Sequence, residues 1–151
     1  HTKKTTVKEF FIFNRLGVCL YHIDLQETPI TNKAINIITE KKLEHRYKLI
    51  FGLLFSLRSF VKKFSFNKEN ETFKSFSTSQ YKLHYLEFIN GLRFVIISNP
   101  TKSDYGGFLR EIFRKFYVNI ITNNLFFDKD AYINNSLFTE MVVSYLNQIT
   151  L

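Results

Sequence analysis

The stretch YKLHYLEFINGLRFVIIS, residues Tyr81–Ser98, decides the fold of this chain. Two runs rich in aromatic and β-branched residues, Tyr81–Phe88 and Leu92–Ser98, lie on either side of Asn90-Gly91. Asn-Gly between such runs is the strongest short hairpin signal, because both residues accept the positive φ that a tight turn requires. The stretch therefore predicts two antiparallel strands.

A second hairpin is predicted near the N-terminus. Val7–Phe13 and Val18–Asp24 are rich in strand-forming residues, and Asn14–Gly17 between them forms a turn in which glycine supplies positive φ. Phe73–Thr78 adds a fifth strand. The runs at residues 10–13 and 94–97 are apolar on both sides, so we expect a sheet that is covered on both faces.

Three segments have helical patterns: Leu43–Phe64, Phe108–Thr122 and Asn134–Gln148. A bend at Tyr105-Gly106-Gly107 precedes the second helix. The core-facing positions predicted for the last two helices are Leu109, Ile112, Phe113, Phe116, Tyr117 and Ile120, and then Leu137, Met141, Tyr145 and Leu146. The order β-β-α-β-β-β-α-α predicts an α/β (α+β) fold. Its mainly antiparallel five-stranded sheet has one helix on one face and two on the other.

Length and composition indicate a single domain over residues 7–151 of the 151-residue chain. Residues 1–6 are an N-terminal extension or a cloning remnant, and residues 25–42 form a surface loop insertion. One cysteine excludes an internal disulfide and suits a reducing compartment. Without a signal peptide or an apolar run of about 18 residues, the expected location is cytoplasmic.

The formal net charge is +8. The basic residues are scattered along the chain, whereas a nucleic-acid footprint gathers them on one face. A basic nucleic-acid-binding domain therefore stays the weakest alternative. Attraction to an anionic membrane or to an acidic partner is the better explanation of the charge.

The helix Leu43–Phe64 carries more apolar surface than one packed face needs. At about 100° per residue its apolar arc covers roughly two-thirds of the circumference. A narrow strip of small residues remains, formed by Gly52, Ser56 and Ser59. We infer a contact with another protein chain, and a helix fully buried within the monomer is the alternative.

No sequence motif indicates catalysis. The strand residues His22 and His84 are more often structural than metal ligands, and Cys19 on a strand is expected to be a buried structural thiol. Neither a nucleophile motif nor a phosphate-binding loop is present. We expect no enzyme activity, cofactor, metal or small-molecule substrate.

Several stretches resemble a known family. Phe10–Leu20, Tyr47–Val61 and Phe76–Tyr85, with the helices Leu109–Phe126 and Leu137–Leu146, are similar to the longin-like small subunits of TRAPP, the transport protein particle. These subunits belong to the sedlin/synbindin group. The resemblance covers nearly the whole chain and departs from the family at the loop 25–42.

The resemblance implies a longin (profilin-like) fold and a non-catalytic structural role. Such subunits bind other TRAPP subunits, of longin-like and α/β types. The assembly tethers vesicles and exchanges guanine nucleotide on a Rab-family GTPase in endoplasmic-reticulum-to-Golgi transport, peripheral to Golgi and endoplasmic reticulum membranes. Another longin-fold trafficking module, of the adaptor small-chain or SNARE regulatory type, is the alternative.

We hypothesise that six residues of the first long helix form its outer contact face. Phe51 and Phe55 are the expected anchors, and Arg58 and Lys62 form the polar rim. The full set of this outer helix face is Phe51, Gly52, Phe55, Arg58, Ser59 and Lys62. The alternative is that the two phenylalanines pack beneath the loop 25–42.

Overall fold

The computed structural model describes residues 7–25, 45, 47–53, 55 and 72–149. The chain forms two compact units, one of residues 1–26 and 70–151 and one of residues 27–69. The elements of the first unit are β1 (Val7–Phe13), β2 (Cys19–Asp24), β3 (Thr72–Ser77), β4 (Lys82–Glu87), β5 (Arg93–Ser98), α2 (Gly106–Glu111), the π-helix η1 (Ile112–Thr122) and α3 (Ser136–Gln148).

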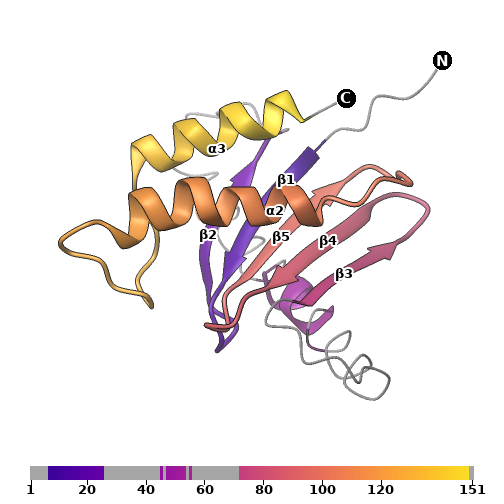
Figure 1. Cartoon of the computed structure of the whole chain (residues 1–151). Helices are drawn as coiled ribbons and strands as arrows, with labels where there is room; N and C mark the ends of the chain where they lie inside the picture. Colours follow the sequence, from indigo (N-terminus) through magenta and orange to yellow (C-terminus); the bar gives the residue numbers. More distant parts are fainter. Residues whose placement is uncertain (1–6, 26–44, 46, 54, 56–71, 150–151) are drawn as a thin grey trace, which may run out of the picture. The chain divides into compact units, whose positions relative to one another are not determined.

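The five strands form one antiparallel sheet in the order β2-β1-β5-β4-β3 (Figure 1). Strand β1 lies between β2 and β5, so Phe11 is opposite His22 on one side and Val95 on the other. Both predicted hairpin glycines have positive φ, 87° at Gly17 and 86° at Gly91. The predicted sheet is confirmed, and each strand begins and ends within one residue of its predicted bounds.

The helices α2, η1 and α3 cover one face of this sheet (Figure 1). The Phe94 ring is fully buried at the centre of the core. It meets Phe10, Phe88, Phe113 and Tyr117 edge to face, at centroid distances of 5.8, 5.1, 5.7 and 5.6 Å. Such edge-to-face pairs stabilise the core beyond the contribution of the area that they bury. The predicted pair of C-terminal helices on one face is confirmed.

The bend predicted at the two glycines is wrong. Helix α2 begins at Gly106, and the N–H of Leu109 donates to the carbonyl oxygen of Tyr105 at 3.0 Å. Gly106 is buried. As the first residue of the helix, Gly106 does not carry the cost of about 1 kcal/mol that glycine has relative to alanine in a helix interior.

The predicted inner face of α3 is also wrong in part. Leu137 and Met141 are 53% and 42% exposed, whereas Phe138 and Val142 are fully buried. The sequence offers two adjacent apolar stripes, each with a spacing of four residues. The helix turns the stripe that begins at Phe138 inward, where Phe138 meets Tyr21 at a centroid distance of 5.0 Å.

Helix η1 continues directly from α2 with wider winding. Its buried residues are Ile112, Phe116, Tyr117 and Ile121. They recur every four to five residues, as the i→i+5 pattern of a π-helix requires. The core-facing role predicted for Ile120 therefore belongs to Ile121, and Ile120 is only partly buried.

The second face of the sheet is apolar and buried as well. Its fully or nearly fully buried side chains are Phe11, Phe13, Leu83, Tyr85, Val95 and Ile97. Two polar pairs lie among them: Nε2 of His22 is 3.3 Å from a carboxylate oxygen of Glu9, and the Arg93 guanidinium is 3.8 Å from a carboxylate oxygen of Glu87. A sheet without a polar face is confirmed. The placement of the first long helix on this face concerns the second unit and stays a prediction.

The edge strand β2 is tied to the chain that enters α3. The N–H of Ile133 donates to the carbonyl oxygen of Leu20 at 2.8 Å. The hydroxyl of Tyr21 lies 2.7 Å from Oγ1 of Thr139, in the first turn of α3. These two hydrogen bonds fix the start of α3 against one edge of the sheet.

In the second unit, residues 45, 47–53 and 55 are helical, as the pattern of Leu43–Phe64 predicts. The remainder of that helix, residues 1–6 and residues 26–42 of the predicted loop lie outside the described residues.

Candidate partner-binding surfaces

The outer helix face is described at three of its six positions. In the second unit Gly52 is exposed, Phe55 is 59% exposed and Phe51 is half-buried. A Cβ added at Gly52 would meet no atom within 4 Å. The surface beside this glycine is thus open to the backbone of another chain. The other three positions, Arg58, Ser59 and Lys62, lie outside the described residues.

The same helix exposes another apolar residue. Leu49 is 61% exposed, while Ile50 is buried. Leu49, Gly52 and Phe55 follow one another at intervals of three residues, so they lie on one side of the helix. The exposed side is therefore apolar around a glycine.

A second surface lies at one end of the first unit, where three loops meet. They are the β1–β2 turn at residues 14–18, the β4–β5 turn at residues 88–92 and the loop 123–135 between η1 and α3. Because β1 and β5 are antiparallel, Phe13 at the end of β1 is opposite Arg93 at the start of β5. The pairing brings both turns to the same end of the sheet.

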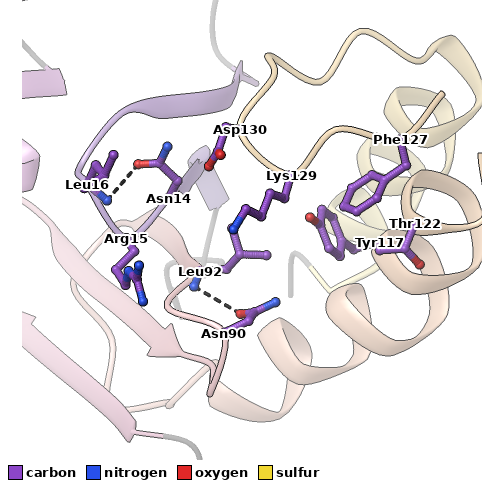
Figure 2. A pocket seen from close by; sticks show the side chains of 10 residues that line it. All are labelled: Asn14, Arg15, Leu16, Asn90, Leu92, Tyr117, Thr122, Phe127, Lys129 and Asp130. Atoms are coloured by element: carbon purple, nitrogen blue, oxygen red, sulfur yellow. Dashed lines mark hydrogen bonds between the residues drawn. The ribbon is translucent and has the colours of Figure 1, made fainter.

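Asparagine side chains hold the two turns in place (Figure 2). Oδ1 of Asn14 accepts hydrogen bonds from the N–H groups of Leu16 at 3.0 Å and Val18 at 2.9 Å. Oδ1 of Asn90 accepts one from the N–H of Leu92 at 3.1 Å. Side-chain bonds of this kind replace backbone bonds in tight turns. These hydrogen bonds therefore order the two turns without other segments packed over them.

A cavity of about 370 Å³ opens between the three loops, and we call it the loop-end cavity (Figure 2). Tyr117 and Phe127 line it on one side, and Arg15 and Lys129 bring two cations to it. Asp130 adds one carboxylate. The cavity thus combines an aromatic wall with a mainly positive lining, a combination that suits an anionic ligand with an apolar part.

The two turns touch through Arg15 and Gly91. A Cβ added at Gly91 would lie 2.8 Å from Cβ and 2.9 Å from Cγ of Arg15. Carbon atoms that are not bonded to one another do not approach so closely. The arginine stem therefore lies across the glycine. Gly91 is required both for its φ of 86° and for this contact.

A buried lysine anchors the chain ahead of α2. Nζ of Lys82 donates to the carbonyl oxygens of Thr101 and Ser103 at 3.2 and 3.0 Å and to Oδ1 of Asp104 at 3.2 Å. The side chain is 9% exposed. A buried ammonium is tolerated where it is paired and fully hydrogen-bonded. Lys82 therefore has a structural role.

His84 completes this network. Its Nδ1 accepts the N–H of Tyr105 at 3.4 Å, and its Nε2 lies 3.0 Å from Oγ of Ser98. Burial, and then the positive charge of Lys82, lower the pKa of His84 to about 4. The neutral ring with its proton on Nε2 satisfies both bonds. The predicted structural role of this histidine is confirmed.

The other candidate reactive groups are also held in the fold. Burial raises the pKa of Cys19 to about 11, which disfavours the nucleophilic thiolate. The ring of His22 stacks on Phe11 at 4.3 Å and lies 3.3 Å from a carboxylate oxygen of Glu9. In the part of the chain that the structure describes, no cluster of His, Cys, Asp or Glu side chains is placed to hold a metal ion.

None of the described helices has both the length and the apolar character that crossing a membrane requires.

The sequence pattern does not reveal the loop-end cavity. Its two turn signals, at Asn14–Gly17 and Asn90–Gly91, are strong. The signal that would place them together is the pairing of β1 with β5, and no local motif specifies that pairing. Lys129, Tyr117 and Arg15 therefore remain isolated residues in the sequence.

Comparisons with known proteins match nearly the whole chain. A model of the Sybindin-like family matches residues 7–149. The chain is 32% identical over 144 residues to trafficking protein particle complex subunit 1 of Rattus norvegicus, covering 95% of this chain and 94% of that protein. It is 31% identical to the Homo sapiens protein of the same name over the same shares. It is 34% identical over 119 residues to trafficking protein particle complex subunit BET5 of Saccharomyces cerevisiae, covering 79% of this chain and 74% of that protein.

The matched region includes every described strand and helix, and the antiparallel sheet with its helices agrees with the longin-like fold that the resemblance implied. With a family model matched over residues 7–149 and relatives aligned along most of their length, the chain belongs to the Sybindin-like family.

Proposed function

We propose that this chain is a structural subunit of a trafficking protein particle complex and that it acts through protein contacts, without catalysis of its own. The observation that carries the proposal is the end-to-end similarity to relatives named as subunit 1 of that complex, with 95% of this chain aligned to 94% of the relative. Similarity over a whole subunit supports the same place in an assembly.

The proposed partners are other subunits of the complex, of longin-like and α/β types. A Rab-family GTPase is reached through the complex, and this chain contributes surface to nucleotide exchange on it. Exchange would follow from contacts that favour GTPase switch conformations with weak affinity for nucleotide and Mg²⁺. The proposed site of action is the cytoplasmic side of Golgi and endoplasmic reticulum membranes. The net charge of +8 supports a peripheral contact with anionic lipid.

The outer helix face is the proposed contact with a neighbouring subunit. Phe55 is 59% exposed and Gly52 beside it is open, which supports an aromatic anchor next to a position of close backbone approach. Phe51 is the second anchor, and Arg58 and Lys62 are the polar rim.

The test is co-expression with the other subunits of the complex, followed by size exclusion and mass identification. Phe55→Asp is expected to weaken assembly by at least about 30-fold, the effect of losing one interface hot spot of about 2 kcal/mol. Leu137→Asp is the matched control, because Leu137 is 53% exposed on α3 and lies outside the proposed face.

Two outcomes would contradict different parts of the proposal. Assembly of a folded Phe55→Asp variant at wild-type strength rejects the outer helix face. Failure of the wild-type chain to recover any subunit of the complex rejects the proposed function, and recovery of adaptor chains in their place would assign the chain to another trafficking assembly.

A further inference from the structure

We propose that the loop-end cavity is a binding site for an acidic peptide segment of a partner protein, with an aromatic side chain against Tyr117 and Phe127 and a carboxylate against Arg15 and Lys129. The site lies wholly within the first unit, whereas the outer helix face belongs to the second unit. The proposal rests on the proposed function in one respect, because a subunit that works through protein contacts binds segments of its partners.

The first observation is a hydroxyl that faces the cavity from a buried ring. Tyr117 is 2% exposed, and its hydroxyl points toward Lys129 across the cavity (Figure 2). No described residue forms a hydrogen bond with this hydroxyl, which is open to the cavity. It is therefore available to donate to an acceptor oxygen of a ligand. Burial raises the pKa of Tyr117, so the phenol stays protonated and acts as a donor.

The second observation is the charge of the lining. Arg15 and Lys129 both line the cavity, and neither forms an ion pair with a described residue. Asp130 is the one carboxylate in the lining. Two cations and one anion leave a net charge of +1, which favours a carboxylate in the ligand. Because the stem of Arg15 lies across Gly91, one of the two cations is held at the rim before the ligand arrives.

The third observation separates a peptide from a small metabolite. Exposed apolar residues continue beyond the cavity: Leu16 is 79% exposed, Ile89 80% and Phe126 92%. Each of them lines the cavity or is next in the chain to a residue that does. A small anion does not need this rim. An extended peptide would cover this rim while one of its side chains enters the cavity.

The experiment uses the full free chain and two synthetic peptides. The probe is acetyl-Asp-Phe-Glu-amide, and its neutral counterpart is acetyl-Asn-Phe-Gln-amide. Amide chemical shifts are followed by NMR during titration. The acidic probe is expected to bind with a Kd of about 1 mM, as a fragment of a longer ligand does. Its shifts are expected at residues 14–17, 90–92 and 122–130. The neutral peptide is expected to bind at least tenfold more weakly.

Three variants locate the binding. Lys129→Glu is expected to weaken the acidic probe at least tenfold, whereas Lys102→Glu changes an exposed lysine at the opposite end of β5 and leaves binding unchanged. Tyr117→Phe removes only the hydroxyl. It is expected to weaken the probe severalfold while the free energy of unfolding stays the same, an outcome that a purely structural role of the hydroxyl excludes.

Several results would overturn the inference. They are absence of shifts up to about 10 mM probe, shifts confined to other residues, equal binding of the neutral peptide, or the same shifts with inorganic phosphate alone. Because the titration needs no other subunit, its failure leaves the co-expression result intact. If co-expression recovers no other subunit but the titration is positive, membership of the complex is rejected and the peptide site is retained.

Discussion

The outer helix face and the loop-end cavity are built in opposite ways. The helix face lies on one continuous segment, where Leu49, Gly52 and Phe55 share a side because a helix repeats every 3.6 residues. The cavity takes its lining from segments that are far apart in the chain, represented by Arg15 and Tyr117. A surface on one element depends on local periodicity, whereas a surface at a loop junction depends on the sheet register and the core beneath it.

This difference is expected to appear in how each surface responds to substitutions elsewhere in the protein. The ring of Tyr117 packs on Phe94 at 5.6 Å, so the wall of the cavity is also part of the core. On the exposed side of the helix, by contrast, Leu49 and Phe55 are 61% and 59% exposed. Three changes, taken from the largest expected effect to the smallest, test this contrast.

The largest effect is expected from Phe94→Ala. The ring is fully buried and meets four aromatic neighbours. Its loss is expected to lower the free energy of unfolding by about 3–5 kcal/mol. Urea unfolding measures this, and Phe76→Ala, at a residue that is 36% exposed, is the control with a loss below about 1 kcal/mol.

Where the Phe94→Ala variant is still folded, binding of the acidic probe is expected to fall, because the support of Tyr117 is lost. Partner binding through the outer helix face is expected to persist. An equal loss at both surfaces would show that the contrast between them is wrong.

An intermediate effect is expected from acid. The pKa of His84 is about 4 in the folded chain against an ordinary value of 6.5, so between these values the unfolded chain binds more protons. The stabilisation is complete above pH 6.5 and declines as the pH falls toward 4. At pH 5 the expected loss is about 2 kcal/mol, at about 1.4 kcal/mol per pH unit.

Urea midpoints at pH 7.5 and pH 5 measure this loss, and His84→Gln is expected to flatten the difference between the two pH values. The His84 network fixes the start of α2, and η1, which carries Tyr117, continues directly from α2. Acid is therefore expected to weaken the loop end as well. An unchanged pH dependence in the glutamine variant would assign the loss to other groups.

The smallest effect is expected from Gly52→Ala. A Cβ at this position meets nothing within 4 Å, so alanine is expected to stabilise the helix by about 0.5–1 kcal/mol. The same methyl group is expected to weaken assembly if a partner backbone lies against the glycine.

Gly107→Ala is the matched control for Gly52→Ala, because Gly107 is also exposed, helical and without neighbours at its Cβ position. It is expected to give the gain in stability without a loss of assembly. If both alanine variants assemble equally well, the inferred close approach of a partner backbone at Gly52 is wrong.

Most of the fold could be predicted from the sequence because its turns are specified locally. Gly17 and Gly91 supply the positive φ of the two hairpins, and the strands between them follow from residue type. The rotation of α3 could not be predicted in the same way. Its stripes starting at Leu137 and Phe138 are equally apolar, and only the tertiary partner Tyr21 decides between them.

The two candidate surfaces also differ in how far the sequence predicts them. Phe55 and Gly52 could be identified from helical periodicity, and both are exposed. Tyr117 could be assigned only to the core, because its ring is indeed buried. That its hydroxyl reaches a cavity depends on the positions of Lys129 and Arg15, which come from two other loops.

The hydrogen bond from Ile133 to the carbonyl oxygen of Leu20, 2.8 Å long, has a consequence for how this protein avoids aggregation. An edge strand with unpaired backbone groups is a template for strands of other chains. On β2 one such group is already occupied by the chain entering α3. A foreign strand that adds to this edge would first have to displace that segment, and with it the anchored start of the last helix.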